Sequence, residues 1–212
     1  MNNTMKQDVL DMTLRCYREK MFAGTSGNLS VFDHETGYMY ITPTSFPYEI
    51  MQLEDIVVID LDGNIVDGIH KPSSEWRMHA AVYRCKPEVN AVIHTHSPYA
   101  TSFAVNRKNI PVILIEMVPF IGGDVPCADF AIPGTDAVGE NCVKVLEERY
   151  ACLMASHGVL AIGKDLEQAH IRAVYVEDAA KICHIAKANG DPIVLIADED
   201  VEFMRNRSKK KK

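Results

Sequence analysis

The spacing of apolar residues predicts the elements of the amino-terminal part of the chain. Apolar positions recur at helical spacing through the segment 4–21, which predicts a first helix that ends before Gly24. Short apolar runs then predict three strands, at 29–32, 38–42 and 56–60. A turn at Asp62-Gly63 returns the chain through 65–66 as a hairpin. This part of the fold is therefore expected to be antiparallel and local.

From residue 75 onward, helical patterns alternate with short apolar runs. Helices are predicted at 75–85, 98–106 and 136–150, and strands at 91–95, 112–115, 151–155 and 159–163. Asp165 can cap a last long helix, whose apolar stripe consists of Leu166, Ala169, Ala173, Val176, Ala180 and Cys183. The alternation predicts the α/β class: a single-domain, three-layer α/β/α sandwich with a mixed, largely antiparallel central sheet and helices on both faces.

Length and composition fit one soluble domain. The chain has 212 residues, of which 47% are hydrophobic and 24% are charged, so one core is expected. The net charge of −7 argues against nucleic acid as a partner, because phosphate backbones attract clustered Lys and Arg. The basic run 209–212 ends the chain. We therefore expect a folded domain over 1–204 and a basic, disordered tail over 205–212.

The protein is expected to be cytoplasmic and to have free thiols. The amino terminus lacks the apolar segment of a signal peptide, and no run of about 18 apolar residues could span a membrane. Six cysteines are scattered through apolar segments without a C-x-x-C pair. They are expected to stay reduced and to pack as small hydrophobic residues. The sequence therefore predicts neither a membrane contact nor a disulfide framework.

Three histidines predict a metal site. His94 and His96 end a strand-like run, and residues two apart on a strand point to the same face. His157 follows a second such run and joins the pair if the two strand ends lie close together, while Gly158 permits an unusual backbone angle. A lone histidine is more often a buried structural residue. Three at two strand ends are typical of a divalent metal site.

Three turns rich in Gly, Ser and Thr predict a phosphate site. They are the segments 24–28, 42–45 and 71–74, which offer backbone N–H groups and hydroxyls. The last one precedes a predicted helix, whose dipole favours an anion. The alternative interpretation is that each is only a turn or an N-cap. Together with a metal site, they favour a small phosphorylated molecule as the substrate.

Glu75 follows the third turn directly. A carboxylate in the first turn of a helix is commonly a solvent-exposed residue that the dipole favours. Here it would lie between a phosphate site and a cation. A metal ion that polarises a carbonyl makes the neighbouring proton acidic, and a carboxylate can remove that proton. Glu75 is therefore the candidate base.

Four motifs follow one another along the chain: Gly24–Ser30 (GTSGNLS), Ile41–Thr44 (ITPT), Pro72–His79 (PSSEWRMH) and His94–Ser97 (HTHS). Together they resemble the class II aldolase and adducin-head family, whose enzymes include the L-fuculose-1-phosphate aldolases. The resemblance extends over roughly residues 5–190 and keeps the order of the motifs, and it makes the expected domain 1–204 an aldolase domain.

The resemblance implies a role for each matching residue. The phosphate-binding positions are Gly27, Asn28, Thr44, Ser45, Ser73 and Ser74. The metal ligands are His94, His96 and His157, with Glu75 as a further ligand that becomes the acid/base once substrate is bound. The family reaction cleaves the C3–C4 bond of a ketose 1-phosphate to dihydroxyacetone phosphate and an aldehyde. The resemblance also implies a homotetramer with active sites at subunit interfaces, and one divalent ion per subunit, with zinc expected and manganese or cobalt as alternatives.

Two positions depart from the aldolase pattern. Ser45 stands where such aldolases have glycine, so it either adopts a strained backbone angle or adds a hydroxyl to the phosphate site. Glu116 stands where they have a tyrosine that reaches a neighbouring subunit and protonates the leaving oxygen. The proton donor is therefore changed, unless Glu116 only caps a loop or pairs with a lysine. Further polar candidates near the site are Tyr48, Tyr99 and Arg107, for which surface roles are expected.

These observations favour a lyase, a metal-dependent aldolase acting on a (deoxy)ketose 1-phosphate such as L-fuculose 1-phosphate. A sister enzyme is the alternative, either an L-ribulose-5-phosphate 4-epimerase or a methylthioribulose-1-phosphate dehydratase. The Glu-Met pair at Glu116 is similar to the corresponding residues of the dehydratases. The third hypothesis is a non-catalytic interaction module like the adducin head. That module predicts loss of the metal ligands, whereas all three histidines and Glu75 are present.

Overall fold

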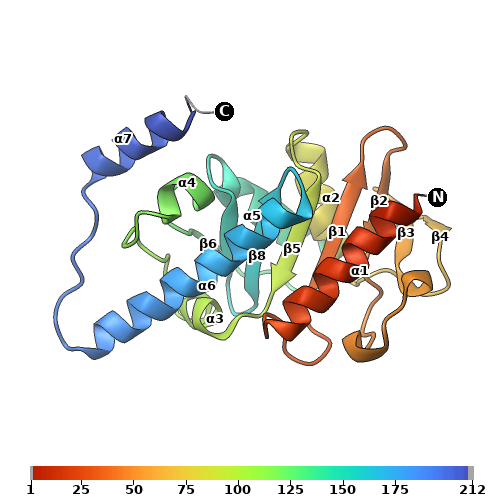
Figure 1. Cartoon of the computed structure of the whole chain (residues 1–212), viewed down its shortest axis with the longest axis horizontal. Coiled ribbons are helices and arrows are strands. Elements are labelled where there is room, and N and C mark those ends of the chain that lie inside the picture. Colours follow the sequence, from red (N-terminus) through yellow and green to blue (C-terminus); the bar gives the residue numbers. More distant parts are fainter. Residues whose placement is uncertain (1, 210–212) are drawn as a thin grey trace.

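The computed structural model describes residues 2–209, which fold around a central mixed sheet (Figure 1). The eight strands of this part of the chain follow the order β4-β3-β2-β1-β5-β8-β7-β6. Every neighbouring pair is antiparallel except β6 and β7, which are parallel. The strands are β1 (Asn28–Asp33), β2 (Tyr38–Ile41), β3 (Val57–Asp60), β4 (Ile65–Asp67), β5 (Ala91–Thr95), β6 (Cys127–Ala128), β7 (Ala151–Met154) and β8 (Gly158–Gly163).

Helices cover both faces of the sheet, as the sequence predicts. The α-helices are α1 (Asn3–Arg18), α2 (Trp76–Cys85), α3 (Pro98–Val105), α4 (Met117–Ile121), α5 (Asp136–Leu146), α6 (Leu166–Ala188) and α7 (Asp198–Lys209). Two short 3-10 helices, η1 (Tyr48–Ile50) and η2 (Leu53–Asp55), precede β3. One hydrophobic cluster joins α1, α3, α4 and α6 to one sheet face, and a second joins α2 and α5 to the other. The three-layer α/β/α prediction is confirmed.

The middle of the sheet lies between the two helical layers. All five residues of β5 are buried, because both faces of the strand are covered, and this explains its unbroken apolar run. The predicted stripe of α6 is buried against the same sheet. The Asp165 side chain accepts a hydrogen bond from the Gln168 backbone N–H at 2.7 Å and caps this helix as expected.

The segment 112–115 is not a strand, contrary to the prediction. It forms no ladder, and an isolated bridge between Ile110 and Val125 lies just before it. Its apolar residues lie in the approach to α4, and Ile115 is 62% exposed. The edge of β7 is instead paired with the two residues of β6. The prediction failed because an apolar run shows that a segment packs on the core but does not show which backbone it pairs with.

Helix α7 was not predicted, and it includes part of the expected tail. The sequence predicts a disordered tail over 205–212, whereas the structure continues α7 to Lys209. Arg205 attaches this helix to the core, because its guanidinium donates two hydrogen bonds to the Gly122 carbonyl at 2.8 and 3.2 Å. Residues 210–212 of the expected tail lie outside the described residues. Within residues 2–209, no helix combines the length and apolar character needed to cross a membrane.

Candidate metal and phosphate site

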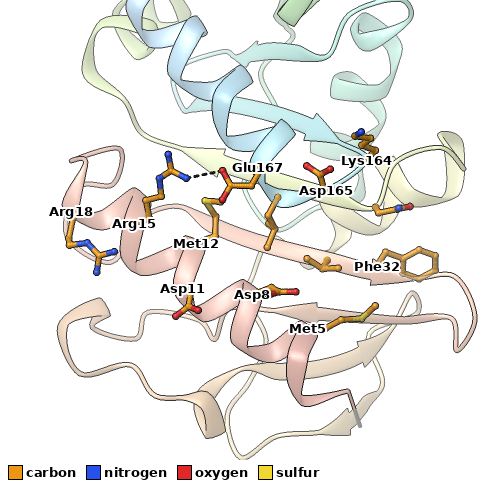
Figure 2. Close-up of a pocket in the computed structure, with 13 residues that line it drawn as sticks. Met5, Asp8, Asp11, Met12, Arg15, Arg18, Phe32, Lys164, Asp165 and Glu167 are labelled. Carbon is orange, nitrogen blue, oxygen red and sulfur yellow. Dashed lines mark hydrogen bonds and ion pairs between the residues drawn. The ribbon is translucent and has the colours of Figure 1, made fainter. Parts of the chain in front are cut away.

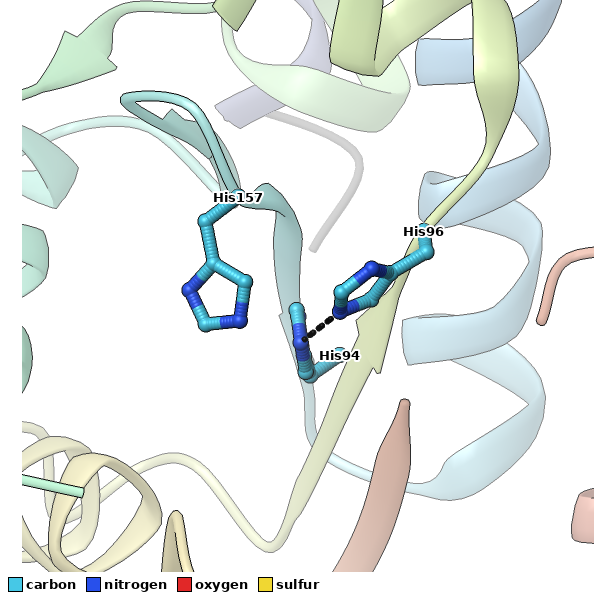
Figure 3. A group of neighbouring side chains, drawn as sticks. All are labelled: His94, His96 and His157. Carbon is cyan, nitrogen blue, oxygen red and sulfur yellow. Dashed lines mark hydrogen bonds between the residues drawn. The ribbon is translucent and has the colours of Figure 1, made fainter. Parts of the chain in front are cut away.

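The three predicted histidines converge at one end of the central strands (Figure 3). β5 carries His94 and continues directly into His96, and the turn between β7 and β8 carries His157. The ring centroid of His94 lies 4.7 Å from those of both His96 and His157, which are 5.1 Å from each other. The rings meet because β5 and β8 are neighbours, with Thr95 paired to Val159.

His94 has the orientation, and His96 and His157 have the neutral form, that metal ligands require. His94 Nδ1 lies 2.9 Å from the Val159 carbonyl oxygen, so Nδ1 is the protonated nitrogen and Nε2 is free to act as a ligand. His94 Nε2 faces His96 Nε2 at 2.9 Å. Burial lowers the pKa of His96 to about 3 and that of His157 to about 4. Both rings are therefore neutral at physiological pH, which is the state that binds metals.

Glu75 lies beside the histidines at the N-cap of α2. Its Oε2 is 3.1 Å from His94 Nε2 and its Oε1 is 3.3 Å from His157 Nε2. Asn28 Nδ2 donates a hydrogen bond to Oε2 at 3.0 Å. Burial by itself would raise the pKa of Glu75, but the neighbouring His94, His157 and Asn28 outweigh it and hold that pKa well below its usual range.

A divalent metal ion fits this set of side chains. Each of the three imidazoles offers one ligand nitrogen, and these three nitrogens lie within 4.8 Å of one another. Glu75 Oε1 is buried and forms no hydrogen bond with any described residue, although it faces these rings. A buried carboxylate oxygen without a partner costs free energy, which a cation bound between the carboxylate and the imidazoles would offset.

The turn that carries His157 is shaped by two residues on either side of it. An unusual backbone angle is expected at Gly158 from the sequence, but the left-handed residue is Ser156, with φ of 55°. Gly158 is required for a different reason, because a Cβ there would lie 2.2 Å from the Thr95 carbonyl oxygen. The absence of a side chain at Gly158 thus lets β8 approach β5 closely enough to bring the histidines together.

The three predicted phosphate loops lie next to one another. The 42–45 and 71–74 segments pair through Thr44 N–H to Lys71 O at 3.1 Å and Ser73 N–H to Thr42 O at 2.9 Å. The 24–28 loop is held by Tyr48, whose buried hydroxyl donates to the carbonyl oxygens of Ser26 and Gly27 at 3.0 and 2.8 Å. Tyr48 therefore supports the loop and does not have the surface role that we expected.

The loop residues differ in how they could contact a phosphate. Gly27 has a φ of +84°, and a Cβ there would lie 2.4 Å from the Phe22 ring. Ser45 has a φ of 51°, so the strained angle considered for this position is present. The Ser73 hydroxyl accepts the Glu75 backbone N–H at 3.3 Å. Ser74 is exposed and Thr44 is half-buried.

Asn28 is placed differently from its expected role. Its side chain is buried and points to Glu75 on one side and to His79 on the other, with Oδ1 2.5 Å from His79 Nε2. The amide is therefore part of the support of the candidate base. His79 was not among the residues predicted for the site. A signal for it was present in the sequence, since His79 follows Glu75 by four residues and so lies on the same side of α2.

Glu116 lies apart from the hydrogen bonds of the histidine cluster. It is the half-buried N-cap residue of α4, and its carboxylate forms no hydrogen bond or ion pair with the described residues. It therefore neither caps α4 through its side chain nor pairs with a described lysine. Of the other candidates, Tyr99 packs against His184 with ring centroids 5.8 Å apart, and Arg107 donates to Ser156 Oγ at 2.7 Å.

A groove of about 700 Å³ lies between α1 and the start of α6 (Figure 2). The ion pair between Arg15 and Glu167, with 2.8 Å between Nη1 and Oε2, links the two helices there. None of the histidines or phosphate-loop residues lines this groove. It is therefore separate from the candidate site.

The family was identified by comparison with known proteins. Residues 7–184 match the model of the class II aldolase and adducin N-terminal domain. The chain belongs to this family. A 5-deoxy-D-ribulose 1-phosphate aldolase of Bacillus thuringiensis serovar kurstaki is 35% identical over 92% of the chain and 91% of that protein. An L-ribulose-5-phosphate 4-epimerase of Salmonella paratyphi C is 34% identical over 86% of the chain and 85% of that protein.

A solved structure supports the same assignment for this class II aldolase family member. An L-fuculose 1-phosphate aldolase structure is 37% identical, with a TM-score of 0.93 over 99% of this chain and 98% of that one. The predicted family and fold are thereby confirmed, and the chain is a lyase of the aldolase type. The relatives act on different sugar phosphates, so the family alone does not identify the substrate.

Proposed function

We propose that this class II aldolase family member cleaves a (deoxy)ketose 1-phosphate, such as L-fuculose 1-phosphate, to dihydroxyacetone phosphate and an aldehyde. The observation that carries the proposal is the position of Glu75. Its carboxylate lies within 3.3 Å of His94 and His157 and directly follows the 71–74 phosphate loop. A base in that position is close both to a bound cation and to the substrate that the loop would hold.

The proposed metal site consists of His94, His96, His157 and Glu75. We propose zinc as the ion, with manganese or cobalt as alternatives, because neutral imidazole suits all three. When bound, the ion would supply the positive charge that polarises the substrate carbonyl and stabilises developing negative charge. His94 is held for this role by its Nδ1 contact with Val159 O at 2.9 Å.

The proposed roles of the remaining residues follow from their positions. The proposed phosphate-binding residues are Gly27, Thr44, Ser45, Ser73 and Ser74, which lie on three adjacent loops, whereas the Asn28 side chain is held between Glu75 and His79. Glu75 would give a proton to C3 once the C3–C4 bond has broken, and would remove it in the reverse reaction. Glu116 has a carboxylate without a partner among the described residues, and we propose that it acts at the site of a neighbouring subunit, where it takes the proton of the C4 hydroxyl as the C3–C4 bond breaks and returns it to the aldehyde oxygen in the reverse reaction. This role requires the proposed homotetramer.

Two sister activities are the alternatives. The epimerase relative, at 34% identity, favours L-ribulose-5-phosphate 4-epimerisation. Glu116 in place of the aldolase tyrosine favours dehydration of methylthioribulose 1-phosphate. The adducin-like interaction module lacks support, because the histidine cluster is complete. A cytoplasmic location stays a prediction.

Product analysis separates these activities. The metal-loaded protein is incubated with fuculose 1-phosphate, ribulose 5-phosphate and methylthioribulose 1-phosphate, and the products are identified by mass spectrometry and a coupled assay for dihydroxyacetone phosphate. Dihydroxyacetone phosphate from the first substrate supports the proposal. Conversion of only the second or third substrate, without that product, assigns a sister activity. Sedimentation velocity on the same sample tests the homotetramer.

A substitution of Glu75 tests its assignment as the base. Glu75→Gln should lower turnover by at least about 10²-fold because proton transfer is lost, while inorganic phosphate still competes with similar affinity. The exposed Glu54→Gln is the matched control and should leave both quantities unchanged. The metal content of both variants is measured, so that loss of the ion is distinguished from loss of the base. An unchanged turnover in Glu75→Gln would contradict the assignment.

A further inference from the structure

A chain of buried polar side chains lies behind Glu75. Tyr83 OH is 2.7 Å from Ser30 Oγ, and Ser30 Oγ is 2.6 Å from His79 Nδ1. His79 Nε2 is 2.5 Å from Asn28 Oδ1, and Asn28 Nδ2 is 3.0 Å from Glu75 Oε2. Strand β1 contributes Asn28 and Ser30, and α2 contributes His79 and Tyr83. This series of hydrogen-bonded side chains thus lies between the sheet and the helix that covers it, and it ends at the candidate base.

All five side chains of this hydrogen-bonded series are shielded from water. His79 and Ser30 are fully buried, and Tyr83, Asn28 and Glu75 are exposed by 3%, 4% and 7%. Polar groups at this depth are retained only when each has a partner, and here every link is within hydrogen-bond distance. An apolar side chain at position 79 would leave two partners unsatisfied, which makes the arrangement demanding to maintain.

The chemistry of the terminal carboxylate determines the direction of every hydrogen bond. An ionised Glu75 only accepts, so the amide NH2 of Asn28 faces it and the amide oxygen faces His79. His79 must then donate from Nε2, which leaves Nδ1 as an acceptor for the Ser30 hydroxyl. Tyr83 donates in turn to Ser30, whose Oγ and carbonyl oxygen lie at 2.7 and 3.0 Å. All donors therefore point toward Glu75.

We infer that His79 is a positioning residue for Glu75, acting through Asn28. It holds the Asn28 amide in the one orientation that donates to Oε2, and this leaves Oε1, which forms no hydrogen bond with a described residue, as the oxygen that takes and returns the substrate proton. The catalytic part of this inference rests on the proposed role of Glu75 as the base. The predicted tautomer of His79 does not depend on that role, so it can be tested independently.

The first experiment reads that tautomer directly. The full-length protein is labelled with 15N-histidine and treated with a chelator, and two-bond 15N–1H correlations are recorded at pH 7. We expect His79 to carry its proton on Nε2 with Nδ1 unprotonated, and its signals are assigned by their loss in His79→Gln. Ser30→Ala should shift the Nδ1 resonance, because it removes the donor to that nitrogen. A proton on Nδ1, or an exchanging mixture of tautomers, would overturn the inference even if the enzyme is active.

The second experiment compares two substitutions at position 79. Glutamine can place an amide N–H near the position of Nε2, so His79→Gln should keep kcat within about threefold of the wild type. His79→Leu cannot donate and should lower kcat by roughly 10- to 100-fold, the usual effect of losing an outer-shell partner. The KM for substrate and the affinity for inorganic phosphate should stay within about twofold in both. Equal losses in the two variants would overturn the inference.

A matched control separates positioning from general stability. Thr13 is also fully buried, and its hydroxyl donates to the Val9 carbonyl at 2.6 Å in α1, away from the site. Thr13→Val should lower the free energy of unfolding without lowering kcat. If His79→Leu does not fold, Ser30→Ala and Tyr83→Phe carry the test, with a larger loss of kcat expected for Ser30→Ala because Ser30 contacts His79 directly. A wild-type protein that cleaves no sugar phosphate would contradict the proposed function and leave the tautomer result standing.

Discussion

Gly158 and Thr95 are in closer contact than any side chain at position 158 would permit. A Cβ at Gly158 would lie 2.2 Å from the Thr95 carbonyl oxygen and 3.1 Å from His94 Cε1. Thr95 separates two of the candidate ligands in sequence, and Gly158 directly follows the third. The spacing of the histidine cluster therefore depends on one glycine between two antiparallel strands.

Gly158→Ala should separate β8 from β5 at the site. Because the clash is with backbone, the strands must move, and we expect a loss of about 1–3 kcal/mol in the free energy of unfolding together with weaker metal binding. Chemical denaturation and metal titration measure the two effects. Gly190→Ala is the control, since Gly190 has a φ of +88° but no atom within 4 Å of the added Cβ. Equal metal affinity in both variants would contradict the role of Gly158.

Arg107 should hold the turn that carries His157. Its Nη1 donates to Ser156 Oγ at 2.7 Å and to the Ala104 carbonyl at 3.0 Å, which ties that turn to the end of α3. Arg107→Met should lower metal affinity by roughly tenfold, as expected for an outer-shell contact, with little loss of stability. Lys108→Met removes the same charge from the neighbouring residue, whose side chain forms no hydrogen bond or ion pair with the described residues, and should not change the affinity.

Metal binding should stabilise the protein through the histidine cluster. Zinc, manganese or cobalt at 100 times its dissociation constant should add about 2.7 kcal/mol, or roughly 5–10 °C in Tm for a domain of this size. Differential scanning fluorimetry after chelator treatment measures the shift. His96→Ala should abolish most of it, whereas His184→Ala, which changes a ring packed against Tyr99, should retain it. An equal shift in both variants would mean that the metal binds elsewhere.

The titration of Glu177 should make the free energy of unfolding depend on pH in the acidic range. Its carboxylate accepts the backbone N–H groups of Tyr99 and Ala100 at 3.0 and 2.8 Å and so caps α3, whose N-cap Ser97 forms no side-chain cap. Burial raises the pKa of Glu177 above the ordinary value of a glutamate carboxyl, despite these two hydrogen bonds. The folded state therefore binds the proton more tightly than the unfolded state does.

The sign of this effect can be tested against Glu177→Gln, which does not titrate. The stability of the wild type relative to Glu177→Gln should be highest below pH 4.5, fall as pH rises through the raised pKa, and stay constant above it. Urea unfolding between pH 4 and 7 measures the difference. Glu177→Ala, which removes the cap, should cost about 0.5–2 kcal/mol. A wild-type advantage that grows with pH would contradict the raised pKa.

Much of the fold could be predicted because its signals are local. The boundaries of β5 matched the prediction, and the α6 stripe was correct because burial on one face imposes helical spacing on six apolar residues. The predictions were wrong where the outcome depends on contacts between segments that are distant in the sequence. The apolar segment 112–115 does not pair with β7, whose edge is paired with β6. Helix α7 is a largely polar helix that is attached through Arg205 and the buried Val201.

The sequence by itself determined which side chains could do the chemistry. Three histidines at two strand ends, a glutamate after a Ser-Ser turn and three polar loops predicted one site, and the structure brings them together. Only the tertiary structure decided how those side chains are used. It turned the Asn28 amide inward between Glu75 and His79, and it showed that Gly158 is required for close strand contact. The reason is physical: the link between Asn28 and His79 spans 51 positions of the chain, and local patterns carry no information about such a contact.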